Sequence, residues 1–240
     1  IMMLSTPIML RLEGVEKTYR VGNENYWALR DVDLKIDEGS FLAFVGPSGS
    51  GKTTLLNLKG GLDRPTKGEI FFRNSQLSKF SHDELAGLRR DEFGFIFQSH
   101  NLLPVYNVYE NVLFPLLLKG EKESSARDRV MTLIEIIGLS EFSGKRPSEL
   151  SGGQCQRAAI ARALVKEPIL VLADEPTANL DSENSCRILE LMRDLNTKFG
   201  SAFLFSTHDE KVTRYVKRQI RLVDGHIQSD QIRRNHGDGP

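Results

Sequence analysis

Residues 40–58, SFLAFVGPSGSGKTTLLNL, contain the motif from which the rest of the chain is interpreted. They begin with an apolar run, residues 41–45, whose length and composition predict a buried strand. A glycine-rich turn over residues 46–51 follows, and residues 52–54, KTT, lead into a helix with regularly spaced leucines. Strand, turn and helix in this order are the setting in which G-x-x-x-x-G-K-[ST] forms a phosphate-binding loop.

Each part of this loop suits a nucleoside triphosphate. Glycines let successive backbone N–H groups turn toward one phosphate, and the start of the following helix adds further donors and the positive end of its dipole. Lys52 is expected to reach the β- and γ-phosphates, and Thr53 offers a hydroxyl to Mg²⁺. A plain glycine turn before a helix is the alternative, but a chance match of the whole pattern arises on the order of once per ten thousand positions or less. The chain is therefore predicted to bind a nucleoside triphosphate.

Composition narrows the remaining classes of protein. The 240 residues carry 32 basic and 32 acidic side chains, so no global field draws the chain to nucleic acid, and we expect no nucleic-acid partner. The longest strongly apolar stretch, residues 112–118, is far too short to span a membrane. Cys155 and Cys186 fit no metal or disulfide pattern and are interpreted as thiols in a reducing compartment. Residues 231–240 are polar enough to predict a disordered tail.

Alternating residues predict a sheet beside the loop. Residues 9–20 and 27–37 alternate as strands do, with a turn-rich insert between them, and residues 68–73 predict another short strand. Together they indicate an antiparallel sheet. Tyr19 lies where the first strand ends, a suitable place for a ring to stack on a base, although a tyrosine on a half-buried strand needs no such role.

Three further apolar strands end in polar residues. The strand predicted over residues 92–97 is followed by Gln98, and the strand predicted over residues 168–175 ends with Asp174 and Glu175. The strand predicted over residues 201–206 is followed shortly by His208. Open α/β sheets bind ligands beyond the carboxyl ends of their strands. One acid there could hold Mg²⁺ while a second orients or deprotonates an attacking water. Solvated acids and a structural histidine are the alternatives, and the phosphate loop favours the catalytic interpretation.

From residue 99 to about residue 155 the pattern indicates a mostly helical insertion. Pro104, Asn107 and Pro115 interrupt its first part, and residues 124–137 have helical spacing. Five of its apolar side chains form either a local core, which is favoured, or a docking surface for a partner. They are Leu102, Leu103, Val105, Tyr106 and Phe114.

A second helix start suited to an anion follows the insertion. The sequence LSGGQ, residues 150–154, precedes an uninterrupted helix over residues 155–165, so bare backbone donors open that helix. Residues 177–181, TANLD, lead into a predicted helix over residues 182–198. A final hairpin over residues 219–227 turns at the Asp-Gly pair.

These motifs resemble those of the ABC (ATP-binding cassette) ATPases. GPSGSGKT, the glutamine of FIFQ, LSGGQ, LVLADE, NLD and STHD occur in the family's order, and LSGGQ is close to diagnostic for it. The segments NLKGGLDRPTKGEI, FGFIFQSHNLLP and ENVLFPLLL are similar to the branch with lipoprotein-releasing (LolD-type) and macrolide-exporter (MacB-type) ATPases. The resemblance implies an α/β fold, a P-loop NTPase core with an antiparallel β subdomain and an α-helical subdomain, in a single domain over residues 8–230.

The resemblance also implies a role for each site residue. Glu175 would be the catalytic base, His208 would hold the γ-phosphate, and Gln98 would contact the metal and sense the membrane subunit. Thr53, Gln98 and Asp174 would be the residues at the metal. The residues implied to bind ATP within one protomer are Tyr19, Gly46, Pro47, Ser48, Gly49, Ser50, Gly51, Lys52, Thr53 and Thr54. Those implied to act on ATP held by a second protomer are Ser151, Gly152, Gly153 and Gln154, and Asp181 would lie between the two sites.

The chain is therefore expected to be the ATP-hydrolysing subunit of an ABC transporter, with ATP and Mg²⁺ as cofactors. Two copies would sandwich two ATP molecules head to tail, and each would dock on integral membrane permease subunits through residues 98–118. This places it as a peripheral protein at the cytoplasmic face of the inner membrane, powering lipoprotein release or export of a small molecule or peptide. A non-transport ABC ATPase of cell division, DNA repair or the ribosome is the alternative. Repair types carry a long coiled coil and ribosome types two cassettes, and neither pattern is found here.

Three positions depart from the pattern of the branch. Lys59 stands where an apolar residue is usual, Cys155 replaces a polar residue and Ala178 replaces a glycine. If position 59 is buried, a lysine there costs stability unless it reaches solvent or finds an acid.

Overall fold

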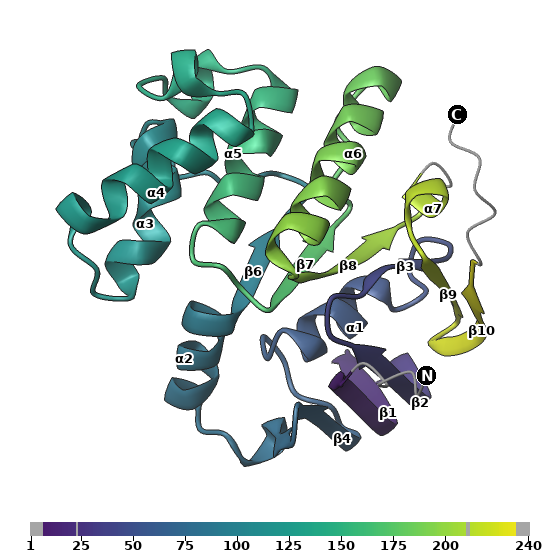
Figure 1. The fold of residues 1–240 in the computed structure, drawn as a ribbon. Coiled ribbons are helices and arrows are strands. Elements are labelled where there is room, and N and C mark those ends of the chain that lie inside the picture. Colours follow the sequence, from purple (N-terminus) through teal and green to yellow (C-terminus); the bar gives the residue numbers. More distant parts are fainter. Residues whose placement is uncertain (1–6, 23, 210–211, 234–240) are drawn as a thin grey trace, which may run out of the picture. The chain divides into compact units, whose positions relative to one another are not determined.

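The computed structural model describes residues 7–22, 24–209 and 212–233, which belong to two compact units. The first unit combines the chain up to residue 85 with the chain from residue 202 onward, and the second comprises residues 86–201. Figure 1 shows the order of the elements along the chain.

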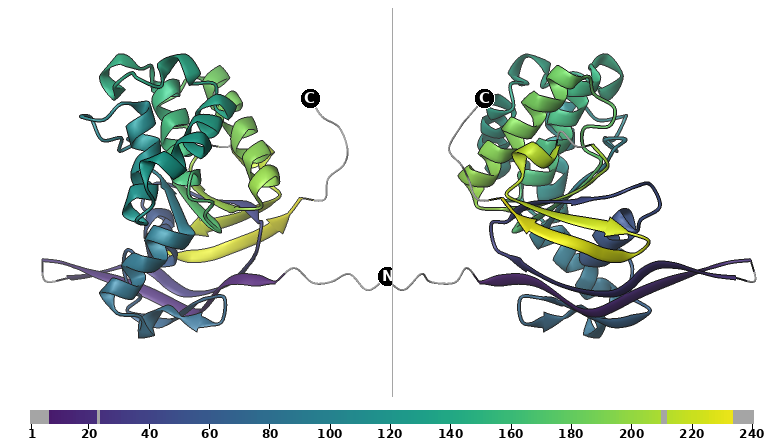
Figure 2. Two further views of the ribbon diagram at one scale, coloured as in Figure 1. Left: turned by 60° about the vertical axis from the view of Figure 1, so that its left-hand side comes forward. Right: turned by 90° about the vertical axis from the view of Figure 1, so that its right-hand side faces the viewer.

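An antiparallel sheet forms one part of the first unit, as predicted. Its strands are β1 (Ile8–Val21), β2 (Glu24–Asp37), β4 (Lys67–Phe72) and β5 (Ser75–Gln76), in the order β2-β1-β4-β5. β1 and β2 are the two long purple strands that lie side by side in Figure 2, and they pair antiparallel. A short 3₁₀ turn over Leu77–Lys79 follows β5.

A second group of strands in the first unit surrounds β3 (Phe41–Val45). β8 (Ala202–Thr207) and β9 (Arg218–Val223) pair with β3 on its two sides, both parallel to it, and β10 (His226–Ile232) pairs antiparallel with β9. All five residues of β3 are buried, which explains why its sequence is continuously apolar. α1 (Lys52–Lys59) follows β3, and a short α7 spans Val212–Tyr215.

The final strand corrects the predicted start of the polar tail. β10 continues through Ile232, so residues 231 and 232 belong to a strand and not to the predicted tail. The ladder with β9 stabilises them, since Gln231 pairs with Gln219 and Ile232 pairs with Arg218. Residues 234–240 of the predicted tail lie outside the described residues.

The second unit holds the parallel strands β6 (Phe93–Ile96) and β7 (Leu170–Asp174). α2 (His82–Glu92), which begins before the unit boundary, was not predicted, and it ends at Glu92, which had been expected to begin a strand. The remaining helices are α3 (Val108–Leu118), α4 (Glu123–Ile136), α5 (Gly152–Leu164), α6 (Ser182–Phe199) and 3₁₀ turns over Ser140–Phe142 and Pro147–Glu149. In the part of the chain that the structure describes, no helix combines the length and the apolar character needed to cross a membrane.

α3 forms part of the predicted helical insertion, although Asn107 and Pro115 were expected to interrupt its first part. Asn107 is the N-cap of α3, since its side chain accepts a hydrogen bond from the backbone N–H of Glu110 at 2.8 Å, and Glu110 Oε2 accepts from the N–H of Asn107 at 2.8 Å. This capping box starts the helix. Pro115 lies inside α3. The buried Asn111 ties the first part of α3 to the preceding segment, because its side chain accepts a hydrogen bond from the N–H of Leu103 and donates one to the carbonyl oxygen of Leu103.

Lys59, at the end of α1, is fully buried, so the expected cost in stability applies. Its Nζ lies 3.2 Å from the centroid of the Phe44 ring and finds no hydrogen-bond partner among the described residues. A cation–π contact in a dry site contributes about 2 kcal/mol, less than the penalty for desolvating an ammonium group. Burial, and next the charge of Arg218, therefore lower the pKa of Lys59 well below its ordinary value.

Candidate functional site

The phosphate loop has the predicted form in the first unit. β3 ends at Val45, the loop follows, and α1 begins at Lys52 (Figure 1). Two glycines are required by close packing. A Cβ at Gly46 would collide with the carbonyl oxygen of Leu222, and a Cβ at Gly51, where φ is 100°, would collide with the carbonyl oxygen of Ala28. The backbone of the loop is thus seated directly on its neighbours, which leaves its outer side for a ligand.

Lys52 lies over this loop. Its Nζ donates hydrogen bonds to the carbonyl oxygens of Gly46 and Pro47, both at 2.8 Å, and its side chain is buried. Gly51, the N-cap of α1, has no side chain with which to cap the helix, and the first turn carries no acidic residue. A positive charge and an uncapped helix start at one place form a site suited to an anion.

His208 leaves its sheet at the same edge as the phosphate loop. In the parallel pair of β3 and β8, Val45 is the partner of Thr207, so Gly46 and His208 are each the next residue after a paired strand end. The side chain of His208 is exposed. The structure therefore brings His208 to the strand ends at which the loop begins, where the sequence predicted it.

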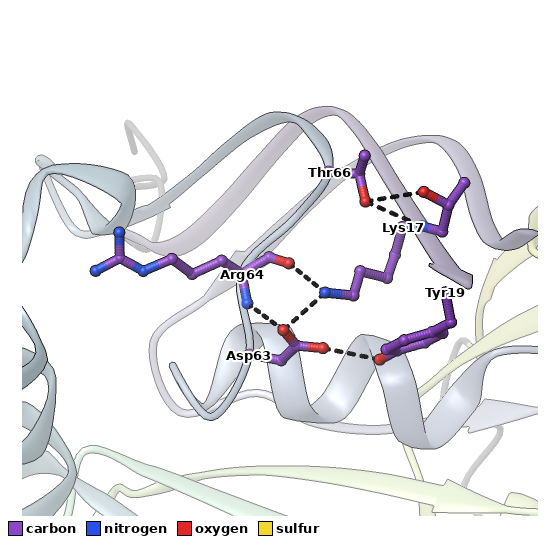
Figure 3. Close-up of polar contacts among 6 residues, drawn as sticks. Lys17, Tyr19, Asp63, Arg64 and Thr66 are labelled. Atoms are coloured by element: carbon purple, nitrogen blue, oxygen red, sulfur yellow. Dashed lines mark hydrogen bonds and ion pairs between the residues drawn. The ribbon is translucent and has the colours of Figure 1, made fainter. Parts of the chain in front are cut away.

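Tyr19 lies on β1 and is 37% exposed. Its hydroxyl donates a 2.8 Å hydrogen bond to Oδ2 of Asp63, and Lys17 binds the other carboxylate oxygen (Figure 3). Neither Lys17 nor Asp63 was singled out from the sequence. Asp63 follows α1 and lies 44 residues from Tyr19 along the chain, a separation that no local pattern reveals.

Tyr26 is a further residue that the sequence analysis missed. It pairs with Tyr19 across the β1–β2 hairpin, and its hydroxyl donates a 3.0 Å hydrogen bond to the carbonyl oxygen of Gly49 in the phosphate loop. The position of the turn between the two strands was the feature of the sequence that could have predicted this pairing. With the hairpin closing between Val21 and Glu24, counting back along both strands sets Tyr26 opposite Tyr19.

The second unit carries the predicted acids at one edge of its strand pair. Ile96 of β6 is the partner of Ala173 of β7, so Gln98 and Asp174 both come at or just beyond the carboxyl ends of these strands. Glu175 follows with φ at 46°, a left-handed conformation that is uncommon outside glycine and occurs often at functional sites. The side chain of Asn179 donates a 2.9 Å hydrogen bond to the carbonyl oxygen of Gln98, which ties the following loop to this edge.

The LSGGQ segment forms the start of α5. Ser151 is its N-cap, in a capping box where its Oγ accepts from the N–H of Gln154 at 3.3 Å and its own N–H donates to Gln154 Oε1 at 2.7 Å. A Cβ built at Gly153 would lie 3.4 Å from Oδ1 of Asn184 on the neighbouring helix α6. Gly153 thus lies next to Asn184 of α6, and a Cβ there would make ordinary van der Waals contact with the Asn184 side chain.

Asp181 caps that neighbouring helix. Its carboxylate accepts hydrogen bonds from the backbone N–H of Asn184 at 2.9 Å and from its side-chain amide at 2.6 Å. These two bonds lower the pKa of Asp181, so its carboxylate stays ionised at neutral pH. The predicted site residues Gln98, Ser151 to Gln154 and Asp181 therefore belong to one packed region of the second unit, joined through Asn179 and Asn184.

The residues available for a metal fit Mg²⁺ with a phosphate ligand. Within residues 7–22, 24–209 and 212–233, no three side chains of the types His, Cys, Asp and Glu gather as a metal-binding group. Mg²⁺ requires no such group, since it usually keeps several waters and binds one or two carboxylates together with substrate phosphates. The hydroxyl of Thr53, the amide of Gln98 and the carboxylate of Asp174 are oxygen ligands of the kind it prefers.

Comparison with known proteins gives a consistent result. The sequence profile of the family described as ABC transporter matches residues 29–178. The uncharacterized ABC transporter ATP-binding protein MJ0796 of Methanocaldococcus jannaschii is 42% identical over 234 residues, which cover 96% of this chain and all of that protein.

Solved structures agree with the sequence comparison. A dimeric structure of MJ0796 in a post-hydrolysis state, bound to ADP and Pi, matches with a TM-score of 0.87 and covers 95% of this chain and 100% of that one. CbiO1 of Clostridium perfringens, described as part of the ABC transporter complex cbiONQ, matches with a TM-score of 0.84 and 29% identity, over 93% of this chain and 88% of its own. The fold is thus that of these cassettes, a mixed α/β fold with an antiparallel sheet and helical elements.

Proposed function

Because this chain belongs to the ABC transporter ATP-binding family, and is an ATPase of that family, we propose that its ATP hydrolysis powers a separate integral membrane permease. The observation that carries the proposal is the phosphate loop on α1, with Lys52 held over its carbonyl oxygens. The proposed class of cargo rests on the resemblance to lipoprotein-releasing and macrolide-exporter ATPases. We propose lipoprotein release, or export of a small molecule or peptide.

In this proposal residues 8–230 act as a single ATPase domain. The phosphate loop and the start of α1 bind the triphosphate, Tyr19 stacks on the adenine, and His208 holds the γ-phosphate. Mg²⁺, when bound, would be held by Thr53, Gln98 and Asp174 and would neutralise charge on the β- and γ-phosphates.

Glu175 is proposed as the general base. A carboxylate next to a metal-binding aspartate can accept the proton of the attacking water while the water oxygen bonds to the γ-phosphorus. The bond from that phosphorus to the β–γ bridging oxygen breaks, and ADP leaves. The left-handed backbone at Glu175 supports this role, since strained conformations are retained where a side chain must point in a particular direction.

The proposed partners are a second copy of this chain and a permease. MJ0796 forms a dimer in its solved structures, and CbiO1 is described as part of a transporter complex, which supports both partners here. We propose that two copies hold two ATP molecules head to tail, each supplying Ser151 to Gln154 to the other's nucleotide. With its permease the chain would be a peripheral protein at the cytoplasmic face of the inner membrane.

Glu175→Gln tests the proposed chemistry. The change keeps the shape of the side chain and removes the base, so turnover should fall by about 10²- to 10⁴-fold while ATP binding is retained. Glu167→Gln is a matched control, because Glu167 is also a glutamate of the second unit with positive φ, at 55°. Turnover of Glu175→Gln within a few-fold of the unaltered chain would remove Glu175 from this role.

Purification of the complex from membranes tests the transport assignment. A partner with several membrane-spanning helices that stimulates ATP hydrolysis would support it. Co-purification with DNA-repair proteins or ribosomes instead would favour the non-transport alternative.

A further inference from the structure

Asp63 lies at the centre of a hydrogen-bonded group between β1 and the loop that follows α1 (Figure 3). Its Oδ2 accepts from the Tyr19 hydroxyl at 2.8 Å, and its Oδ1 accepts from Lys17 Nζ and from the backbone N–H of Arg64, both at 2.7 Å. Both carboxylate oxygens are therefore engaged, and among the described residues the phenol is one of three groups that they bind.

Lys17 fixes this carboxylate from the strand side. Besides Asp63, its Nζ binds the carbonyl oxygen of Arg64 at 2.7 Å, and its side chain is only 12% exposed. The next residue, Thr18, continues the attachment, since its N–H donates to Oγ1 of Thr66 at 3.0 Å. The loop over residues 63–66 is thus bound to β1 through the two residues that directly precede Tyr19.

The charge states keep the Tyr19–Asp63 bond in one direction. Burial raises the pKa of Asp63, but hydrogen bonds from Lys17, Tyr19 and the Arg64 N–H outweigh it, so the pKa of Asp63 is lowered and the group stays a carboxylate. Burial and the bond to Asp63 raise the pKa of Tyr19, which remains a phenol that donates. A phenol on a carboxylate is a charge-assisted hydrogen bond, roughly twice as strong as a neutral one.

The ring of Tyr19 is consequently held at two places. Its hydroxyl is fixed on Asp63 by the 2.8 Å hydrogen bond. Lys17 Nζ lies 4.8 Å from the ring centroid, over one face. A side chain with two rotatable bonds that is anchored at its far end has lost most of its rotational freedom before any ligand arrives.

We propose that Asp63 is a positioning residue for nucleotide binding, which holds the Tyr19 ring at a fixed orientation and distance from the phosphate loop so that an adenine base can stack on it. The inference rests on the proposed function, in which Tyr19 contacts the base. Asp63 itself touches neither base nor phosphate in this proposal. Its contribution is to order Tyr19 in advance, so that the ordering does not oppose binding.

The test compares ATP with tripolyphosphate, which has the phosphates without the base. Dissociation constants are measured without Mg²⁺, so that no turnover occurs, and KM and kcat are measured with Mg²⁺. Immobilising a side chain costs about 0.5–1.5 kcal/mol, so Asp63→Ala and Tyr19→Phe should each weaken ATP binding about three- to tenfold. For Asp63→Ala, tripolyphosphate binding and kcat should stay within about twofold. The double variant should be no weaker than the weaker single variant, because both changes remove one bond.

Matched controls separate this role from a general loss of contacts. Asp230→Ala also removes an ion-paired carboxylate of the first unit, bound to Arg218 and with 35% side-chain exposure against 32% for Asp63, and it should leave the ATP-to-tripolyphosphate ratio unchanged. Tyr109→Phe removes a hydroxyl bonded to Glu123 at 3.1 Å and serves the same purpose for Tyr19→Phe. If Asp63→Ala does not fold, Tyr19→Phe and Asp63→Asn still test the bond, since both retain a polar partner for Lys17.

Three results would overturn the inference. They are equal weakening of ATP and tripolyphosphate by Asp63→Ala, unchanged ATP binding in Tyr19→Phe, and multiplying effects in the double variant. Tyr19→Ala separates this failure from that of the proposed function. If it weakens ATP while Asp63→Ala and Tyr19→Phe do not, only the role of Asp63 is wrong. If Tyr19→Ala has no effect, the base does not stack on Tyr19 and both proposals fail.

Discussion

The hydroxyl of Tyr26 donates a hydrogen bond of 3.0 Å to the carbonyl oxygen of Gly49, so the β1–β2 hairpin is fastened to the middle of the phosphate loop. The peptide group is planar, and a carbonyl held in place therefore fixes the N–H of Ser50 on the other side of the same plane. One phenol thereby restrains two of the backbone groups from which the loop is built.

Tyr26→Phe should weaken ATP binding without unfolding the protein. The change removes one hydrogen bond at a half-exposed side chain, which contributes about 0.5–1 kcal/mol, so the dissociation constant for ATP should rise about two- to fivefold. In contrast to Asp63→Ala, it should weaken tripolyphosphate equally, because the loop binds phosphate. Calorimetric titration with both ligands checks this, with Tyr109→Phe as the control. An effect on ATP alone would mean that Tyr26 acts through the base.

Lys59→Met should stabilise the chain. Methionine has a similar length and needs no hydrogen bond, so the desolvation penalty of the buried amine disappears while the packing on Phe44 is kept. We expect the free energy of unfolding to increase by roughly 1–4 kcal/mol, measured by urea denaturation. The control is Lys198→Met, since Lys198 also lies near a phenylalanine ring, 5.9 Å from Phe199, but on the surface. A less stable Lys59→Met chain would show that the amine has a favourable interaction.

The same penalty should depend on pH. The pKa of Lys59 is lowered in the folded state, while in the unfolded state it is near 10.4, so between the two values the unfolded chain binds more protons. Stability should therefore rise with pH in that window, and the penalty should vanish above about pH 10.4. The difference in stability between Lys59→Met and the unaltered chain should shrink accordingly. A difference that is constant with pH would mean that Lys59 is buried in its charged form.

Mixing two inactive variants tests the head-to-tail dimer. Lys52→Ala removes the charge held over the phosphate loop, and Ser151→Arg removes the cap of α5 and adds bulk at its start. If the sites are shared, a mixed dimer has one site with both lesions and one with none, so activity should recover, up to about a quarter of the sites for random pairing. Recovery is measured as phosphate release at several mixing ratios.

Mixed dimers that form but show no recovery are distinguished by counting nucleotides. One ATP per mixed dimer would mean that sites are shared and that both must be intact for hydrolysis. No intact site in any mixed dimer would contradict the shared arrangement.

Val105→Asp tests the docking surface. Val105 is 69% exposed, whereas Tyr106 is half-buried and packs on Phe114 with ring centroids 5.9 Å apart. Tyr106 therefore belongs to the local core, and Val105 is the residue that is available to a partner. A charge at Val105 should abolish stimulation of the ATPase by its membrane partner and leave basal activity unchanged. Ile232→Asp is the control, an apolar residue of the first unit with 73% exposure. Stimulation that survives Val105→Asp would place the partner elsewhere.

The parts of the fold that follow local rules were predictable from the sequence. The buried β3, the loop and α1 are encoded within 19 consecutive residues, and the LSGGQ helix start is encoded by its own capping residues. The insertion that contains α3 was predicted to be mostly helical, but the bounds of α3 were not, because Asn107 and Pro115 each have two meanings. Asparagine ends one helix and caps the next, and only the glutamate three residues later shows which applies.

Contacts made between distant segments were beyond local reasoning. Asp63 looks like an ordinary acid in a Gly-Leu-Asp-Arg-Pro turn, and its partners Lys17 and Tyr19 are 46 and 44 residues away. Likewise, residues 231–232 belong to a strand through their pairing with Gln219 and Arg218 of β9, which the polar stretch around them does not reveal. Tertiary pairing overrode local propensity at both places.

Lys59 makes the opening of α1 measurable by chemistry. Amine-acylating reagents modify unprotonated lysines that they can reach, so surface lysines such as Lys198 react promptly. Lys59 has no accessible surface and can be acylated only when α1 separates from β3, so its rate of modification reports how often the helix behind the phosphate loop detaches. Any molecule that binds the loop and holds α1 in place should slow that labelling, and a mass spectrum of one peptide would then reveal occupancy of the site without any assay of turnover.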